Sequence, residues 1–399
     1  MTASPAKRPD EGRAGGGPIR VVAFGGGHGL SASLRALRHS ARELDLEITA
    51  IVTVGDDGGS SGRLRAERDA LLPPGDLRQA LAALAADHPT TRLTASLMQH
   101  RFAAMPDDPS TGHGEASVAQ PIRPAVPVQP GGAASPAVAA ASSPRQGGGG
   151  GDGLHLDRVL VRGPRVERRA DRTRDTLAGH AVGNLLLLGL IEMLGDPVLA
   201  LDHAAEMVGA QGRVLPMALH AVGIEADVMA ADGAAFTVRG QHSVAVADGR
   251  VTALRLVPAD PPACPEAIEA VRTADWLIFG PGSWYTSVLP HLLVPELAAA
   301  IVASPARRLV TLNLSGEKET TGLSAAGHLA ALRWYLPELR VDTVLADATW
   351  AGEPEPVRVA ARELGAELVL APVAVADGSP RHDPQSLGVA LVPVLGAAR

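Results

Sequence analysis

Short apolar runs alternate with amphipathic stretches along most of this 399-residue chain. The runs are rich in Val, Ile and Leu and span only a few residues, which is typical of strands buried on both faces of a sheet. They cover 19–24, 48–54, 274–280, 307–314, 339–347 and 366–373. The stretches that predict helices cover 30–43, 76–86, 295–304, 325–336, 357–365 and 384–395. This alternation predicts an α/β fold with a Rossmann-like, doubly wound and mostly parallel sheet.

The middle of the chain has a different pattern. A leucine-rich helix is expected to begin near Asn184 and to stop at the Gly-Asp-Pro sequence 195–197. Further on, the segments 236–240, 242–249 and 250–258 resemble short strands joined by turns. They predict a small antiparallel β insertion.

Two segments are too poor in apolar residues to form a core. Residues 1–17 lack both an apolar period and the apolar region of a secretory signal, so we expect a disordered leader. Residues 104–153 are rich in Pro, Ala, Gly and Ser and predict a low-complexity, disordered insert. What remains predicts a single α/β domain over 18–399, interrupted by that insert.

Composition narrows the class of protein. The formal net charge of −7 and an isoelectric point near 6.0 argue against a general nucleic-acid binder. The arginines of 158–174 are interleaved with acids, and we interpret that segment as a solvated linker or hairpin, with a nucleic-acid-binding arm as the less favoured alternative. The single Cys264 excludes an internal disulfide and fits a reducing cytoplasm. No apolar run reaches the roughly 18 residues of a membrane helix. We therefore expect a cytoplasmic protein.

Two glycine loops follow predicted strands: "FGGGHGLS" at 24–31 and "FGPGSWYTS" at 279–287. Such loops let a ligand approach the backbone, and the helix that follows offers free N–H groups to an anion. Neither loop fits the standard dinucleotide or P-loop fingerprint, because Leu30 stands where the third glycine belongs and no Gly-Lys-Ser/Thr follows. Trp284, inside the second loop, could stack on a base or sugar, or pack against the following helix.

A third polar loop, "GDDGGSSGR" at 55–63, follows the second strand. Asp56 and Asp57 could hold ribose or sugar hydroxyls, or a Mg²⁺ ion shared with phosphates. Arg63 could pair with a phosphate through two hydrogen bonds. Asp76, in "LPPGD", is interpreted as a helix N-cap first and a ligand contact second. The plain alternative for the whole segment is an acidic turn.

The fourth loop is "GHAVGN" at 179–184, where His180 and Asn184 share one helix face if the helix begins early enough. The alternative is that Asn184 caps the helix and Gly183 serves packing. The other histidines show no metal-ligand spacing, so no transition metal is predicted.

Taken together and in this order, these motifs resemble the YvcK-like gluconeogenesis factor family, within the 2-phospho-L-lactate transferase-like (CofD-like) superfamily. "TLNL", "ETTGLSAAGHLAAL" and "RHDPQSL" also look like family landmarks, and the likeness spans about 18–103 and 175–395. It implies a bacterial protein linked to growth on gluconeogenic carbon sources and to cell shape. It also implies binding of a UDP-sugar such as UDP-N-acetylglucosamine, with no assigned reaction.

The resemblance adds further residues to those of the four loops. Asn313 fits the family's polar strand end, Glu319 and Thr320 fit the Glu-Thr of its next loop, and Arg381 fits its late Arg-His-Asp motif. The candidate ligand-binding residues are Gly25, Gly26, Gly27, His28, Gly29, Asp56, Asp57, Ser60, Ser61, Arg63, Asp76, His180, Asn184, Gly280, Gly282, Ser283, Thr286, Ser287, Asn313, Glu319, Thr320 and Arg381. His28 replaces a threonine that the family usually carries. A homodimer is suggested only by analogy with the family.

Two functions stay open at this point. One is a non-catalytic sugar-nucleotide sensor, favoured by phosphate-suited loops without an obvious nucleophile–base pair. The other is a CofD-type transferase of phosphorus-containing groups, in which Asp56 and Asp57 position Mg²⁺ over a pyrophosphate. An NAD-dependent oxidoreductase is disfavoured by the missing fingerprint.

Overall fold

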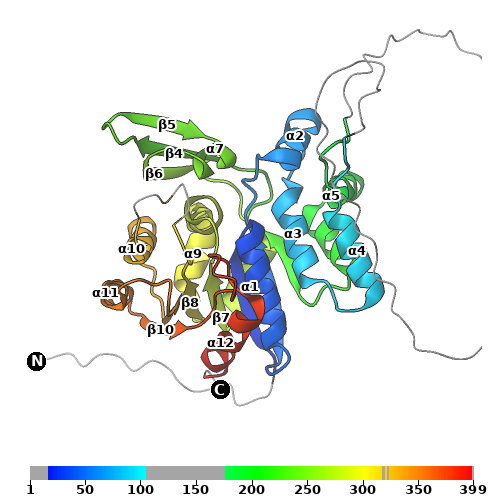
Figure 1. The fold of residues 1–399 in the computed structure, drawn as a ribbon. Helices are drawn as coiled ribbons and strands as arrows, with labels where there is room; N and C mark the ends of the chain where they lie inside the picture. The colour runs from blue at the N-terminus through cyan, green and yellow to red at the C-terminus, as the bar shows by residue number, and fades with distance from the viewer. Residues whose placement is uncertain (1–16, 105–175, 317–319, 321–322, 398–399) are drawn as a thin grey trace, which may run out of the picture. The chain divides into compact units, whose positions relative to one another are not determined.

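A computed structural model describes residues 17–104, 176–316, 320 and 323–397 (Figure 1). Almost all of the predicted leader and insert lie outside the described residues. So do the arginine-rich segment 158–174 and Glu319.

The larger sheet has seven strands in the order β10-β9-β8-β7-β1-β2-β3, and every neighbouring pair is parallel. Its strands are β1 (Ile19–Gly25), β2 (Leu46–Val52), β3 (Arg213–Pro216), β7 (Trp276–Phe279), β8 (Arg307–Thr311), β9 (Thr343–Asp347) and β10 (Glu367–Ala371). The predicted doubly wound parallel sheet is therefore confirmed.

The order of the strands reverses between β1 and β7. The chain proceeds from β1 to β2 and β3 on one side, and from β7 to β8, β9 and β10 on the other. Phe24, the residue before the last of β1, and Phe279, the last of β7, stack their rings with centroids 4.7 Å apart. In open parallel sheets, ligands bind beyond the carboxyl ends of the strands at such a reversal.

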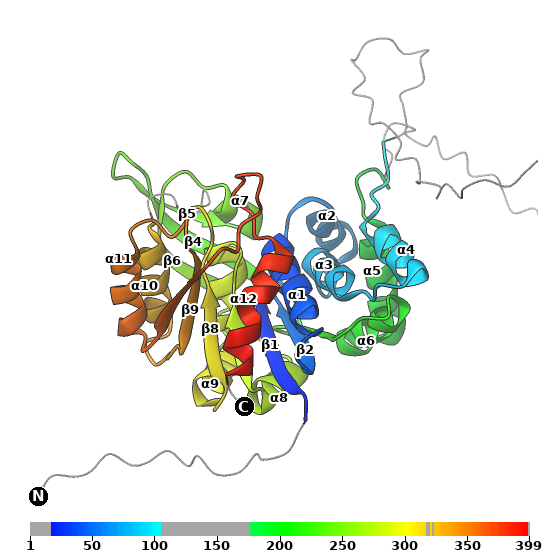
Figure 2. The same ribbon diagram turned by 60° about the horizontal axis from the view of Figure 1, so that its bottom comes forward.

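Helices cover both faces of the sheet. The described helices are α1 (Gly27–Ser40), α2 (Gly59–Arg68), α3 (Pro74–Leu84), α4 (Pro89–Gln99), α5 (Val182–Leu194), α6 (Pro197–Met207), α7 (Gln241–Ala245), α8 (Pro265–Thr273), η1 (Trp284–Val288), η2 (Leu289–Leu293), α9 (Pro295–Ala303), α10 (Ala325–Tyr335), α11 (Pro354–Glu363) and α12 (Pro384–Gly396). Helices α1 and α12 lie side by side in front of β1 (Figure 2). Helices α2 to α6 gather beyond the β2–β3 side.

The antiparallel insertion consists of β4 (Gly223–Met229), β5 (Ala235–Arg239) and β6 (Arg250–Val257), in the order β5-β4-β6. The small sheet lies with α7 at the carboxyl end of the large sheet (Figure 1). The prediction of a strand over 242–249 is wrong, because this segment begins with α7. The third strand is β4, whose alternating burial marks a half-exposed strand.

In the described ranges no single helix is long and apolar enough to cross a membrane. One bent pair, Trp284–Leu292 with Pro295–Ala303, passes that test together by length and composition.

Candidate functional site

The two glycine loops meet directly at the reversal between β1 and β7. A Cβ on Gly29 would collide with the carbonyl oxygen of Pro281 and would lie 2.5 Å from Cα of Gly282. The Ser33 hydroxyl donates to the Gly280 carbonyl at 3.1 Å, which ties α1 to the same loop. Glycine is therefore required at 29 by the close approach of two backbones.

Asn313, predicted as a ligand contact, holds the second glycine loop in place. Its Oδ1 accepts from the N–H of Gly282 at 2.9 Å, and its Nδ2 donates to the carbonyl of Gly282 at 2.8 Å. Both ends of the amide are engaged, so Asn313 fixes the loop that follows β7 from the end of the neighbouring strand β8.

Asp76 lies against the first glycine loop. Its Oδ2 accepts from the Thr53 hydroxyl at 3.1 Å, and its carboxylate accepts from the backbone N–H of Gly27. Burial, with the nearby Asp56 charge in second place, raises the pKa of Asp76 to about 7. Helix α3 begins at Pro74 after Pro73, so the prediction that Asp76 is the N-cap is wrong: it lies inside the first turn.

The predicted acidic pair Asp56 and Asp57 points in two directions. The Asp57 Oδ1 accepts from the N–H of His242 at 2.8 Å, at the start of α7. The Asp56 Oδ1 accepts from the N–H of Gly58 at 3.0 Å, and its Oδ2 lies against Gly75 at the start of α3. The carboxylate that lies near Asp56 is therefore that of Asp76. Among the described residues no group of three or more His, Cys, Asp or Glu side chains could hold a metal ion.

Ser60, His180 and Asn184 form one buried hydrogen-bond network. The Ser60 Oγ lies 2.8 Å from Nδ1 of His180, and Nδ2 of Asn184 donates to Ser60 Oγ at 2.9 Å. Asn184 Oδ1 in turn accepts from Nε of Arg78 at 2.8 Å. Helix α5 begins at Val182, so His180 and Asn184 converge on Ser60 rather than along one helix face. Gly183 serves packing, because a Cβ there would meet Met98 at 2.8 Å.

Other predicted residues support the same loops. Ser61 Oγ accepts from the N–H of Gly75 at 3.0 Å, and Nη2 of Arg63 donates to the carbonyl of Ala178 at 2.7 Å. In the second glycine loop the Thr286 hydroxyl donates to Ser283 Oγ. Ser287 Oγ lies beside Gly26, opposite the place where a Cβ would stand.

The remaining predictions are placed as follows. His28 is exposed on the first turn of α1. Thr320 is buried, whereas Glu319 lies outside the described residues. Arg381 is exposed, and its Nη2 donates to Asp377 of its own loop at 2.8 Å.

Trp284 is fully buried in edge-to-face contact with His328, with ring centroids 5.1 Å apart. Of the two alternatives that the sequence left open for it, the structure favours packing.

Sequence reasoning missed Thr53 and Arg78. Thr53 directly follows β2 and is fully buried. A buried hydroxyl needs a hydrogen-bond partner, and here that partner is Asp76. Arg78 is 3% exposed on α3, a helix whose other buried side chains are mostly Leu and Ala. A lone arginine in an apolar helix next to a candidate acid was the available signal.

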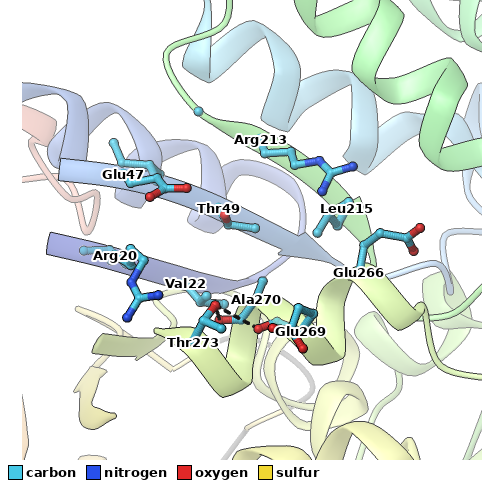
Figure 3. A pocket seen from close by; sticks show the side chains of 13 residues that line it. Arg20, Val22, Glu47, Thr49, Arg213, Leu215, Glu266, Glu269, Ala270 and Thr273 are labelled. Carbon is cyan, nitrogen blue, oxygen red and sulfur yellow. Dashed lines mark hydrogen bonds between the residues drawn. The ribbon is translucent and has the colours of Figure 1, made fainter. Parts of the chain in front are cut away.

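Two cavities lie away from the contact between the two glycine loops. One of about 470 Å³ is lined by the first residues of β1 and β2, by β3 and by α8, near the amino ends of the strands (Figure 3). Its charged rim includes Arg20, Glu47 and Arg213. The other, of about 790 Å³, lies between α2 and the small sheet and is lined by Asp57, Arg65 and Arg239 among others. Only the second cavity adjoins a candidate loop.

These features define the chain as a Rossmann-like α/β protein whose polar loops converge at the reversal of its parallel sheet. The chain belongs to the family of the 2-phospho-L-lactate transferase CofD, whose family model matches residues 21–370.

Its relatives include the gluconeogenesis factor of Bacillus subtilis, which is 32% identical over 82% of this chain and 78% of that protein. A Mycobacterium tuberculosis protein that bears the same name provisionally is 42% identical over 93% of this chain and 89% of its own length. A crystal structure of a UPF0052-family protein from Bacillus halodurans matches with a TM-score of 0.67 and 30% identity. That match covers 95% of this chain and 100% of the other.

Proposed function

We propose that this protein is a gluconeogenesis factor that binds a UDP-sugar, such as UDP-N-acetylglucosamine, in the bacterial cytoplasm. In this proposal the ligand lies at the reversal between β1 and β7. Its binding serves growth and cell morphogenesis on gluconeogenic carbon sources. The names of the relatives support the role in gluconeogenesis, and the geometry of the loops supports the ligand.

The observation that carries the proposal is the contact between Gly29 and Gly282. It aligns the start of α1 with the loop after β7 at the place where α/β proteins bind nucleotides. Helix α1 follows Gly26, has no side-chain cap and has no acid in its first turn. The N–H of Gly27 donates to Asp76, and the N–H groups that follow it, together with the helix dipole, suit a pyrophosphate.

The chemistry of the described side chains favours binding over turnover. The hydrogen bond between Ser60 and His180 is of the kind that activates a nucleophile. Both side chains are buried, however, and Ser60 also accepts from Asn184. We interpret the pair as part of the scaffold that holds α2 against α5.

Isothermal titration with UDP-N-acetylglucosamine tests the proposal, with and without Mg²⁺. Ser283→Asp adds a negative charge to the second glycine loop while keeping an oxygen that can accept from Thr286. We expect it to weaken binding by about tenfold or more through charge repulsion. Ser96→Asp on exposed α4 is the matched control and should bind like the wild type. Absence of heat together with absence of thermal stabilisation by any UDP-sugar would refute the proposal.

A CofD-type transferase with bound Mg²⁺ is the second candidate, and the approach of Asp56 to Asp76 favours it. Two carboxylates at a pyrophosphate site are the ligands that Mg²⁺ uses between protein and phosphate. Asp56 and Asp76 would hold the metal, which would neutralise the charge of the phosphate oxygens. This candidate predicts ligand affinity that a chelator abolishes, and affinity that resists a chelator counts against it.

A further inference from the structure

Arg78 has an unusual environment for an arginine. It is 3% exposed on α3, and among the described residues no carboxylate lies within ion-pair distance of it. Burial, and next the charge of Arg101, lower its pKa to about 10. Arginine is almost never fully buried unless it is paired with an anionic group. The described part of the chain supplies no such group within ion-pair distance of this guanidinium.

The hydrogen bonds around Arg78 fix which of its atoms are in use. Its Nε donates to Asn184 Oδ1, which turns the Asn184 amide so that Nδ2 donates to Ser60. Ser60 must then give its only hydrogen to Nδ1 of His180. The His180 ring is therefore neutral, with its hydrogen on Nε2. Desolvation and the charge of Arg63 lower its pKa in agreement.

The two terminal nitrogens of Arg78 have no hydrogen-bond partner in the described part of the chain. They are also not among the fully enclosed polar atoms that lack a partner, such as Nε of Arg308. Each of them therefore keeps some contact with solvent. A guanidinium with its Nε fixed presents this pair of donors as a rigid fork, which matches two oxygens of one anion.

The surroundings of the fork are suited to an anion. Arg63 and Arg101 donate to the carbonyls of Ala178 and Gly179, which places both cations beside the His180 segment. The first turns of α2 and α5 carry Ser60 and Asn184, and neither helix has a side-chain cap. Asp56, Asp76 and Glu67 are the acids whose charges act on Arg78 or His180.

We propose that Arg78 is the centre of a second binding site, which takes a tetrahedral oxyanion: inorganic phosphate or the phosphate group of a small phosphorylated ligand. The site lies among α2, α3 and α5, beyond Asp76 from the glycine loops. It stands whether or not a nucleotide sugar binds between β1 and β7, so the two proposals can fail separately.

Titration of the full-length protein with inorganic phosphate, in a phosphate-free buffer, tests this site. At about 10 mM phosphate we expect the melting temperature of the wild type to rise by roughly 2 °C. Arg78→Met should abolish the rise. Arg92→Met on exposed α4 removes an arginine that forms no ion pair within the described part of the chain, and it should respond like the wild type. An equal rise in Arg78→Met and in the wild type, or no rise in the folded wild type, overturns the proposal.

Asn184→Asp keeps the test decisive if Arg78→Met does not fold. The new carboxylate has the shape of the amide and still accepts from Nε of Arg78, so it supplies the missing counter-ion from within the chain. We expect a folded protein whose phosphate affinity, measured by calorimetry, falls about tenfold or more. Unchanged affinity in this variant contradicts the proposal.

Three further titrants define the ligand. Sulfate should stabilise the wild type as phosphate does, because it has the same tetrahedral oxygens. Acetate should not, and equal stabilisation by acetate overturns the assignment to a tetrahedral oxyanion. A larger response to glycerol 3-phosphate than to phosphate assigns the site to a phosphorylated ligand, and an equal or smaller one assigns it to free phosphate.

Discussion

Gly29 shows how one missing side chain shapes the candidate site. The residue has an ordinary backbone conformation in α1, so its requirement comes from space and not from a positive φ. The loop after β7 fills that space, and any side chain at 29 would push it away from α1. The position of both glycine loops therefore depends on this contact.

Gly29→Ala should destabilise the protein by about 2 kcal/mol or more, because the Cβ meets backbone that cannot move aside cheaply. Gly189→Ala is the matched control. It lies on α5 with open space around its Cβ, and it should stabilise by roughly 0.5–1 kcal/mol. Urea unfolding of both variants checks the pair. Equal effects would show that the two loops are not in contact.

Asp76 makes stability depend on pH. Its folded pKa of about 7 lies above the ordinary value of 3.8, so between these values the folded state holds a proton that the unfolded state has lost. This contribution to stability is fully present below about pH 4 and is lost as the pH rises through about 7.

Asp76→Asn should therefore flatten the decline of stability between pH 5 and 7, by up to about 1.4 kcal/mol per pH unit relative to the wild type. Urea unfolding across this range measures the two slopes. Parallel slopes in the wild type and Asp76→Asn would contradict the raised pKa.

At the scale of elements, apolar runs predicted six of the seven strands of the large sheet, because these strands are apolar on both faces, whereas the four-residue edge strand β3 was missed. The helix α7 was mistaken for a strand because the alternation in "HSVAVADG" resembles a half-buried strand. A contact distant in sequence decides the outcome, since the Asp57 carboxylate accepts from the first turn of α7. No local pattern contains that contact.

Because Asp57 accepts from the N–H of His242, we expect Asp56 and Asp57 to contribute differently to any metal-dependent ligand binding. Asp57→Asn should leave the Mg²⁺ dependence of ligand affinity nearly unchanged, because its carboxylate serves α7. Asp56→Asn should reduce it at least about tenfold if Mg²⁺ binds between Asp56 and Asp76. Calorimetry with and without a chelator compares the two variants. A larger effect of Asp57→Asn would restore the acidic pair predicted from the sequence.

At the scale of the whole molecule, segments near 26, 56, 76 and 282 gather because parallel strands end at one edge of the sheet. The sequence could predict this gathering from the loop motifs and the sheet topology. It could not predict which side chains the scaffold uses. Asn313 and Arg63 donate to backbone carbonyls, and Arg381 pairs with an acid of its own loop. The role of Arg78 depends on the packing of α3 against α5, which no local sequence pattern contains.

The pH dependence of ligand binding follows from the same arrangement. In the presence of a chelator, affinity for an anionic UDP-sugar should fall several-fold as the pH rises from about 6 to 8, because Asp76 then ionises beside Gly27. Calorimetry across this range measures it, with Asp76→Asn expected to give a flat profile. A rise in affinity with pH would instead indicate a site in which ionised Asp76 holds a cation.

Hydrogen–deuterium exchange with and without UDP-N-acetylglucosamine locates the ligand on the protein. We expect slower exchange in the backbone at 25–30 and 280–287, the two glycine loops, when the ligand is bound. Protection confined to the amino-end cavity around Arg20, Glu47 and Arg213, or no protection in either glycine loop at saturating ligand, would contradict it.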